Sequence, residues 1–319
     1  MLRRRCEGVA LVVALLVVAL ATILVAALLD RGELALARTR NGLRAEQAEA
    51  YAQGLEAYAV QVLMLPRDAA DTAVSPWAQP MPPQVVPGGL VTASMRDLNG
   101  CFNLNNLDPD HRKAWQPVFQ RLLAALGVDS RVKDAIENWL DPGTADSADA
   151  NAYLAQAVPY RPRGGPFAHV SELRLVRGID GATYARLAPH VCALPAGTKI
   201  NPNTATVPVL QALASATDAP ATLAIAQKLW QNGQARWTDP TVFWNAAGVA
   251  VTAGQAALVD TRSGAFLARG DIVLDGVPFT VFRLILAPPN GRVQVVQRSR
   301  GADEALLGAA PIDDVDASP

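Results

Sequence analysis

A run of 21 residues without a charged side chain, 9–29, constrains the fold of this chain more than any other feature. About 20 apolar residues coiled as a helix cross the roughly 30 Å hydrocarbon core of a bilayer. Three arginines at positions 3–5 precede the run, and positive charge on that side holds the N-terminus in the cytoplasm. We therefore expect one membrane-spanning helix with the body of the protein on the far side. Cleavage as an ordinary secretory signal near Ala26 and Ala27 is the alternative, although such signals have shorter apolar cores.

The segment that follows, 30–65, predicts a continuation of this helix. It holds no proline before the end of the segment, and it is rich in the strong helix formers Ala, Leu, Glu and Gln. Apolar side chains recur at steps of three and four residues and give one apolar stripe, formed by Leu43, Ala48, Tyr51, Leu55, Tyr58 and Val62. We expect a single amphipathic rod that ends at Pro66.

Two groups of strands are predicted, far apart in the chain. Residues 66–89 contain six prolines and are expected to be loop, whereas 90–107 predicts two short strands that turn at Asn99-Gly100. Residues 265–300 predict three more strands, with turns at Asp275-Gly276 and Asn290-Gly291. We expect these five strands to form an antiparallel sheet on the long helix.

Between the strand groups the pattern changes to helical, over residues 108–260. Expected helices cover Trp115 to Leu126, Ser130 to Leu140, Val170 to Val176, Ala182 to Val191, Thr206 to Ala214 and Pro220 to Trp230. Asp108 and Ser130 suit N-cap positions, and Asn203 or Thr204 is expected to cap the helix that follows them. The sequence thus predicts an α+β fold with a large all-α domain inserted between its strands.

The leader ending in Gly8, the uncharged span that starts directly after it and the amphipathic continuation resemble the class III signal sequences of type IV pilins and type II secretion pseudopilins. The resemblance implies that prepilin peptidase removes residues 1–8, cuts between Gly8 and Val9, and methylates the new N-terminus of Val9. The span 9–29 would then be retained in the mature protein.

Further segments are similar to one family of pseudopilins, the general secretion pathway protein K of type II secretion. They are "DLNGCFNLNNL", "WLDPGTADSADANAY", "PYRPRGGPFAHVSELRLVRGID" and "KINPNTATVPVLQAL". The resemblance implies a pilin-like α/β domain made of 66–107 and 261–301, an inserted helical domain of 108–260, and a disordered tail of 302–319. It also implies a single-pass protein of the bacterial inner membrane with a periplasmic body.

The same resemblance implies a position and partners. Most pilins carry a glutamate a few residues after the cut, where this chain has Val13. A subunit without that carboxylate suits the tip of the filament, where no subunit lies above it to supply a terminal ammonium. The protein would assemble there with other minor pseudopilins and the major pseudopilin, and would initiate or cap a periplasmic pseudopilus during export across the outer membrane. Prepilin peptidase and inner-membrane lipid are the remaining expected partners.

Two candidate sites follow from the residues and this compartment. Cys6 would leave with the leader, so Cys101 and Cys192 could form a disulfide in an oxidising periplasm, or remain two buried thiols. Asp141, Asp146 and Asp149 lie in a loop where the resembled family binds calcium, and carboxylate oxygens suit Ca²⁺. Solvated carboxylates in a surface turn are the alternative, because the spacing is not that of an EF-hand.

DNA binding and catalysis are the other functions to weigh. "VRGIDGATYARLAPHV" is similar to a helix-hairpin-helix unit, in which a Gly-x-x-Gly turn holds DNA phosphates, so a membrane-anchored DNA-uptake protein is the alternative function. Asp180 in the turn and the formal net charge of −1 oppose nucleic-acid binding. The three histidines, His111, His169 and His190, lack metal-ligand spacing, and the sequence holds no recognised catalytic motif. We therefore expect no enzymatic activity.

Overall fold

The computed structural model describes residues 5–143, 148–250 and 252–301, without the side chains of residues 5–8, 148 and 149. The chain divides into two compact units, Met1–Gln53 and Gly54–Pro319. One helix, α1 (Arg5–Met64), runs through 60 residues without a break. The prediction of a single rod ending near Pro66 is confirmed. The predicted disordered tail, 302–319, lies outside the described residues.

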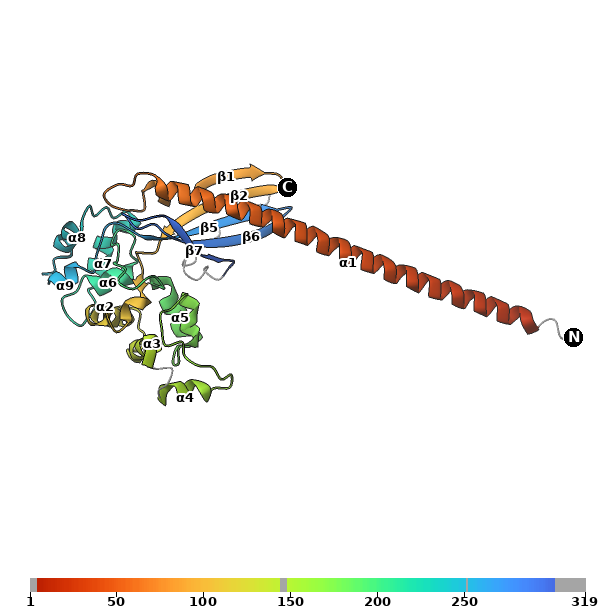
Figure 1. Ribbon diagram of the computed structural model, residues 1–319, viewed down its shortest axis with the longest axis horizontal. Helices are drawn as coiled ribbons and strands as arrows, with labels where there is room; N and C mark the ends of the chain where they lie inside the picture. Colours follow the sequence, from red (N-terminus) through yellow and green to blue (C-terminus); the bar gives the residue numbers. More distant parts are fainter. Residues whose placement is uncertain (1–4, 144–147, 251, 302–319) are drawn as a thin grey trace. The chain divides into compact units, whose positions relative to one another are not determined.

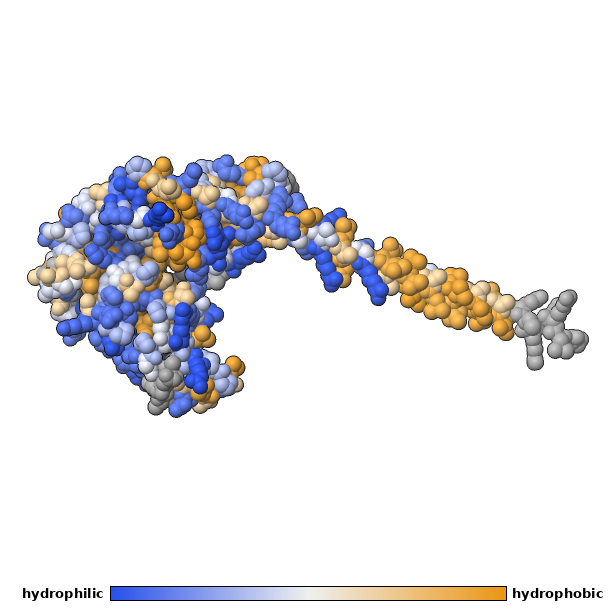
Figure 2. Space-filling view, in the orientation of Figure 1, coloured by the Kyte–Doolittle hydropathy of each residue, from blue (hydrophilic) through white to orange (hydrophobic). Residues whose placement is uncertain are grey.

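Residues 9–29 of α1 present an apolar surface. Figure 2 shows this hydrophobic stretch, and the apolar side chains of residues 9–29 are all exposed. Within the described residues, α1 is the helix whose length and composition would allow it to cross a membrane. An exposed apolar surface of this size needs lipid or other protein to cover it.

The last turns of α1 pack on a sheet through a narrower stripe than the sequence predicts. Ala59 and Leu63 are buried and contact Phe266 and Ala268 in one hydrophobic cluster. Tyr58, which the predicted stripe includes, is 41% exposed. Val62 of the predicted stripe is partly buried against the same cluster. Small and branched side chains, rather than the tyrosine ring, fit the close approach of helix and sheet.

The sheet has five antiparallel strands in the order β1-β2-β5-β6-β7 (Figure 1). They are β1 (Met81–Val86), β2 (Gly89–Asp97), β5 (Ala265–Leu274), β6 (Val277–Leu286) and β7 (Gln294–Ser299). Asp275 and Gly276 both have positive φ, at 48° and 78°, as the predicted tight turn between β5 and β6 requires. The predicted fold class, a long helix on an antiparallel sheet with further helices, is confirmed.

The first part of this sheet differs from the prediction in two ways. Strand β1 lies in the proline-rich segment predicted to be loop, which is possible because β1 is an edge strand and needs fewer backbone donors. The predicted hairpin at Asn99-Gly100 is wrong, because β2 ends at Asp97 and pairs with β1 and β5 instead. Gly100 serves a close approach: a Cβ there would lie 2.3 Å from the carbonyl oxygen of Thr204.

The remaining elements are short, and the helices after β2 gather at one side of the sheet (Figure 1). The α-helices are α2 (Arg112–Ala125), α3 (Arg131–Leu140), α4 (Ala148–Leu154), α5 (Gly181–Leu187), α6 (Val207–Leu213), α7 (Leu223–Trp230), α8 (Pro240–Ala247) and α9 (Ala253–Ala256). The 3-10 turns are η1 (Pro76–Ala78), η2 (Leu104–Leu107), η4 (Val170–Leu175), η5 (Ala188–His190) and η6 (Gln231–Gly233). Strands β3 (Phe102–Asn103) and β4 (Val191–Cys192) form a separate parallel pair.

Five of the six predicted helical segments contain an α-helix, and Val170 to Val176 contains the 3-10 turn η4, while α4, α8 and α9 are additional. The predicted N-caps differ in detail. Asp108 lies outside α2 and accepts the backbone N–H of His111 at 2.8 Å. Ser130 is the N-cap residue of α3, as predicted, but its side chain makes no capping hydrogen bond. Asp129 takes that role by accepting the N–H of Arg131 at 2.9 Å. The inserted domain boundaries, 108–260, stay a prediction, because residues of the helices and of the sheet share one hydrophobic cluster.

Glu56 fixes the end of α1 to two strands of the sheet. Its carboxylate accepts hydrogen bonds from Nε of Arg283 on β6 at 2.9 Å and from Nε and Nη2 of Arg298 on β7 at 2.8 and 2.6 Å. The side chains of Arg283 and Glu56 are 5% and 17% exposed. The hydrogen bond from Arg298 lowers the pKa of Glu56, so the charged form is favoured in the folded state.

We expect Glu56→Gln to lower the free energy of unfolding by about 3 kcal/mol, because a buried guanidinium loses its counter-charge. Denaturant unfolding of the detergent-solubilised protein measures the change. Glu33→Gln, on an exposed position of the same helix, is the control and should change it by less than about 0.5 kcal/mol. Equal losses in the two variants would contradict this role for Glu56.

Candidate functional site

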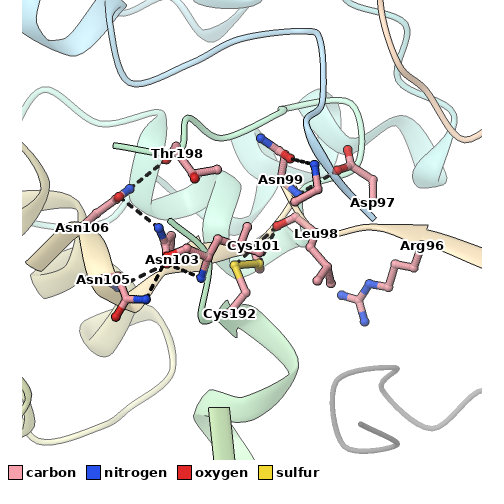
Figure 3. Close-up of a disulfide and its surroundings, with 12 residues drawn as sticks. Arg96, Asp97, Leu98, Asn99, Cys101, Asn103, Asn105, Asn106, Cys192 and Thr198 are labelled. Atoms are coloured by element: carbon pink, nitrogen blue, oxygen red, sulfur yellow. Dashed lines mark hydrogen bonds between the residues drawn. A yellow bond between two sulfur atoms is a disulfide. The ribbon is translucent and has the colours of Figure 1, made fainter. Parts of the chain in front are cut away.

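Asp97, the last residue of β2, is a buried carboxyl where the sheet meets the helices. It is 3% exposed. Its Oδ2 accepts hydrogen bonds from the hydroxyls of Thr204 and Ser263, both at 2.6 Å, and from Nδ2 of Asn201 at 3.0 Å. Its Oδ1 accepts the backbone N–H of Asn99 at 2.7 Å (Figure 3). One side chain thus joins three segments that are far apart in the sequence.

Burial raises the pKa of Asp97 to about 6, and the four hydrogen bonds oppose that rise without cancelling it. The carboxyl is therefore partly protonated in the folded protein at a pH where an unfolded chain is fully ionised. Because the folded state holds the extra proton, this group favours folding more strongly as the pH falls from about 6 towards 4.

His190 has the opposite dependence. Its Nδ1 lies 2.9 Å from the hydroxyl of Thr206. Burial, followed by the positive charge of Arg96, lowers the pKa of His190 to about 4. The unfolded chain takes up a proton below pH 6.5 that the folded state refuses, so this group destabilises the fold as the pH falls. As the pH falls over this range, Asp97 therefore raises the free energy of unfolding and His190 lowers it.

Two asparagines of the segment "INPNTA" complete the junction. Asn201 Nδ2 lies 2.9 Å from the carbonyl oxygen of Asp71 in addition to its bond with Asp97. Asn203 accepts the N–H of Trp237 at 2.6 Å and donates to the carbonyl of the same residue at 3.1 Å. The prediction that Asn203 or Thr204 caps the next helix is wrong: Thr206 is the N-cap of α6, and its side chain makes no capping bond.

A second set of buried asparagines lies beside the first, in and after β3. Asn103 accepts the N–H of Leu194 at 2.9 Å and donates to Asn106 at 3.1 Å (Figure 3). Asn105 accepts the N–H of Phe167 at 2.7 Å and donates to two carbonyls, at 2.8 and 3.0 Å. Asn106 donates to Thr198 and accepts from Gly197, both at 2.8 Å. These amides replace the sheet partners that the surrounding backbone lacks.

Cys101 and Cys192, which the sequence left as a possible pair, are joined by a disulfide with a Cα–Cα distance of 5.9 Å (Figure 3). The bond links the two short parallel strands, in which Asn103 pairs with Cys192. It closes a loop of 91 residues, for which chain entropy gives a stabilisation of roughly 4–5 kcal/mol.

The predicted processing and metal residues are placed separately from this junction. Gly8 and Val9 both lie within α1, near its start. Asp141 ends α3, and its Oδ1 accepts the N–H of Gly143 at 2.9 Å. Asp146 lies outside the described residues, as does the side chain of Asp149. Among the described residues no group of three or more metal-ligating side chains comes together.

The Gly-x-x-Gly turn, residues 178–181, leads into α5. A carboxylate of the chain itself lies at the start of this helix. Asp180 is the N-cap, and its carboxylate accepts the N–H of Thr183 at 2.7 Å. This hydrogen bond lowers the pKa of Asp180, which keeps the negative charge in place. Gly178 has φ of +88°, the left-handed conformation that glycine adopts freely. The turn is thereby built as a helix-helix corner.

The two buried ionisable groups predict opposite pH profiles. We expect the free energy of unfolding of the protein, minus that of Asp97→Asn, to increase by about 2.4 kcal/mol between pH 7 and pH 4, since the pKa is raised from 3.8 to about 6. The same difference taken with His190→Gln should decrease over that range. Denaturant unfolding at several pH values measures both differences. If the difference between the protein and Asp97→Asn did not change with pH, the Asp97 carboxyl would have the same pKa in the folded and unfolded states.

The comparisons with known proteins agree along the chain. A family model described as "Type II secretion system (T2SS), protein K" matches residues 100–196. Type II secretion system protein K of Pseudomonas aeruginosa is 39% identical over 235 residues, covering 66% of this chain and 69% of the relative. The protein of the same name from Klebsiella pneumoniae is 31% identical over 322 residues, covering 94% and 98%.

A solved structure gives the same result. The crystal structure of the GspK-GspI-GspJ complex from the type 2 secretion system of enterotoxigenic Escherichia coli contains a chain that matches with a TM-score of 0.69 and 26% identity. The match covers 83% of this chain and 99% of the solved one. DNA binding, the alternative weighed from the sequence, finds no support in these relatives. The chain belongs to the type II secretion system protein K family.

Proposed function

We propose that the protein is a minor pseudopilin that assembles with other minor pseudopilins at the tip of the periplasmic pseudopilus and initiates or caps it during export across the outer membrane. The observation that carries this proposal is the match to a chain of a three-protein secretion complex over 83% of the sequence. Counterparts of GspI and GspJ are the proposed partners, and the major pseudopilin lies below them.

Two features of the chain support a position at the tip. The helices and turns between residues 98 and 260 bury their apolar side chains in a large cluster that also includes Leu267 and Phe282 of the sheet. These helices and turns pack against one face of the sheet and leave little room for another subunit to stack above this one in the filament. Val13 also lacks the carboxylate that would neutralise the terminal ammonium of a subunit above.

The proposed location is the bacterial inner membrane, with the N-terminus in the cytoplasm and the body in the periplasm. The exposed apolar run of α1 supports the anchor, and the arginines before it support the orientation. The disulfide supports an oxidising compartment for the body. We propose a structural role and not an enzymatic one.

Overproduction tests the tip position. A tip subunit in excess should start more filaments from the same pool of major pseudopilin, so the pseudopili should become shorter in electron micrographs. Antibody against this protein should label one end of each filament. Longer filaments labelled along their whole length would contradict the proposal.

Processing by prepilin peptidase is tested at Gly8. Replacing Gly8 with Phe should leave a precursor that migrates more slowly on a gel, because the bulky side chain blocks the peptidase. Cys6→Ser, in the same leader, should leave processing unchanged. Mass spectrometry of the mature protein should show Val9 as a methylated N-terminus, and a start beyond Leu29 would contradict retention of the span.

Calcium binding by Asp141, Asp146 and Asp149 stays a proposal, supported by the carboxylates of this acidic loop. Titration calorimetry with Ca²⁺ should give a saturable heat that a variant with all three residues changed to Asn loses. Changing the exposed Asp275, in a different loop, to Asn should leave the heat unaltered. Equal heats from all forms would exclude these carboxylates as ligands.

A further inference from the structure

A groove of about 630 Å³ lies between the last turn of α1 and the loop 287–293 that joins β6 to β7. Three arginines line it, Arg67, Arg262 and Arg292, and no Asp or Glu is among the described residues that do so. We call it the arginine groove. Its charge is unusual in a chain whose formal net charge is −1.

Arg67 builds the floor of the arginine groove and is not available to a ligand. Its Nη1 donates to the carbonyl of Ser263 at 2.9 Å and its Nη2 to the carbonyl of Ala287 at 2.8 Å. Asp71, 1% exposed, neutralises it at 3.4 Å. Asp71 is itself held inward, because it accepts hydrogen bonds from Trp77 Nε1 and from the N–H of Ser263.

Arg262 and Arg292 supply the uncompensated charge. Nε of Arg262 is buried and has no hydrogen-bond partner among the described residues. Asp260 does not satisfy it, since that carboxylate accepts the backbone N–H of Arg262 at 3.1 Å and pairs with Lys199 at 3.5 Å. The Arg262 side chain thus lines the groove without a carboxylate partner among the described residues.

The turn that carries Arg292 is rigid before any ligand arrives. The N–H of Gly291 donates to the carbonyl of Pro288 at 3.0 Å, and two consecutive prolines restrict the first half of the turn. A Cβ on Gly291 would lie 2.5 Å from the ring of Pro288. Little conformational freedom is therefore lost on binding at this wall of the groove.

Apolar side chains adjoin the two arginines at the opposite wall. Met64 and Leu65, the end of α1 and the residue after it, are 69% and 57% exposed. A ligand that fits the arginine groove thus combines an anion with an apolar group. An inorganic phosphate satisfies the arginines alone, whereas a peptide with a carboxylate beside an apolar side chain satisfies both walls.

We propose that the arginine groove binds an acidic segment of a partner protein, with an Asp or Glu carboxylate held by Arg262 and Arg292 and an apolar neighbour against Met64 and Leu65. Guanidinium groups bind carboxylates through paired, charge-assisted hydrogen bonds, and Arg262 and Arg292 both line the groove. Charge complementarity favours an acidic occupant, because the groove carries cations without lining carboxylates among the described residues.

Selection from a random peptide library displayed on phage tests the proposal, with the full-length protein in non-ionic detergent as target. Selected peptides should carry Asp or Glu next to an apolar residue. In fluorescence anisotropy, Arg262→Gln with Arg292→Gln should weaken their binding about tenfold or more, as expected for lost charge-assisted hydrogen bonds. Arg236→Gln, at an exposed arginine outside the groove, removes one positive charge and should leave binding unchanged.

Two further measurements keep the result unambiguous. Arg292→Glu changes only an exposed turn, so it should abolish binding while the circular dichroism spectrum and unfolding midpoint stay the same. Vesicles of phosphatidylglycerol test a lipid headgroup as the source of the anion. Peptides selected without acidic residues, binding indifferent to the double variant, or loss of vesicle binding alone would each overturn the proposal.

Discussion

Hydrogen bonds from buried side-chain amides hold together the part of the molecule where regular structure is sparse. Six buried asparagines, at positions 99, 103, 105, 106, 201 and 203, supply them together with Asp97. An amide offers both a donor and an acceptor, so one asparagine can replace both partners of a missing sheet ladder. Without these side chains, the buried backbone around Leu194 and Trp237 would lose its partners at about 1–3 kcal/mol for each group.

Local sequence signals predict the elements whose conformation depends on neighbouring residues alone. The uninterrupted α1 follows from composition and the absence of proline, and the β5–β6 turn follows from Asp275-Gly276. The Asn-Gly signal at Asn99 failed because its side chain is committed elsewhere. It donates to the carbonyl of Lys199 and accepts the N–H of Gly264, which are 100 and 165 residues away. Such long-range bonds override a turn preference that acts over two residues.

Only some residues of the candidate site can be predicted from the sequence. The segment "DLNGCFNLNNL", which carries part of the family resemblance, begins with Asp97, but nothing in the residues around it indicates that this carboxyl is buried. Helix α8, in contrast, was missed although its signal is present. Asp239 precedes Pro240, and its carboxylate accepts the N–H groups of Thr241 and Val242, as an N-cap before an N1 proline does.

Strand β5 connects the layers of the unit Gly54–Pro319. Alternate residues of a strand face opposite sides of its sheet. Phe266 and Ala268 accordingly pack with the end of α1, and Ala265 and Leu267 pack with the helices on the other side. A slip of one residue would exchange the two faces, and the ten-residue pairing of β5 with β6, together with its pairing to β2, prevents it. The last turns of α1 and the helices on the other side are therefore both packed against this one central strand.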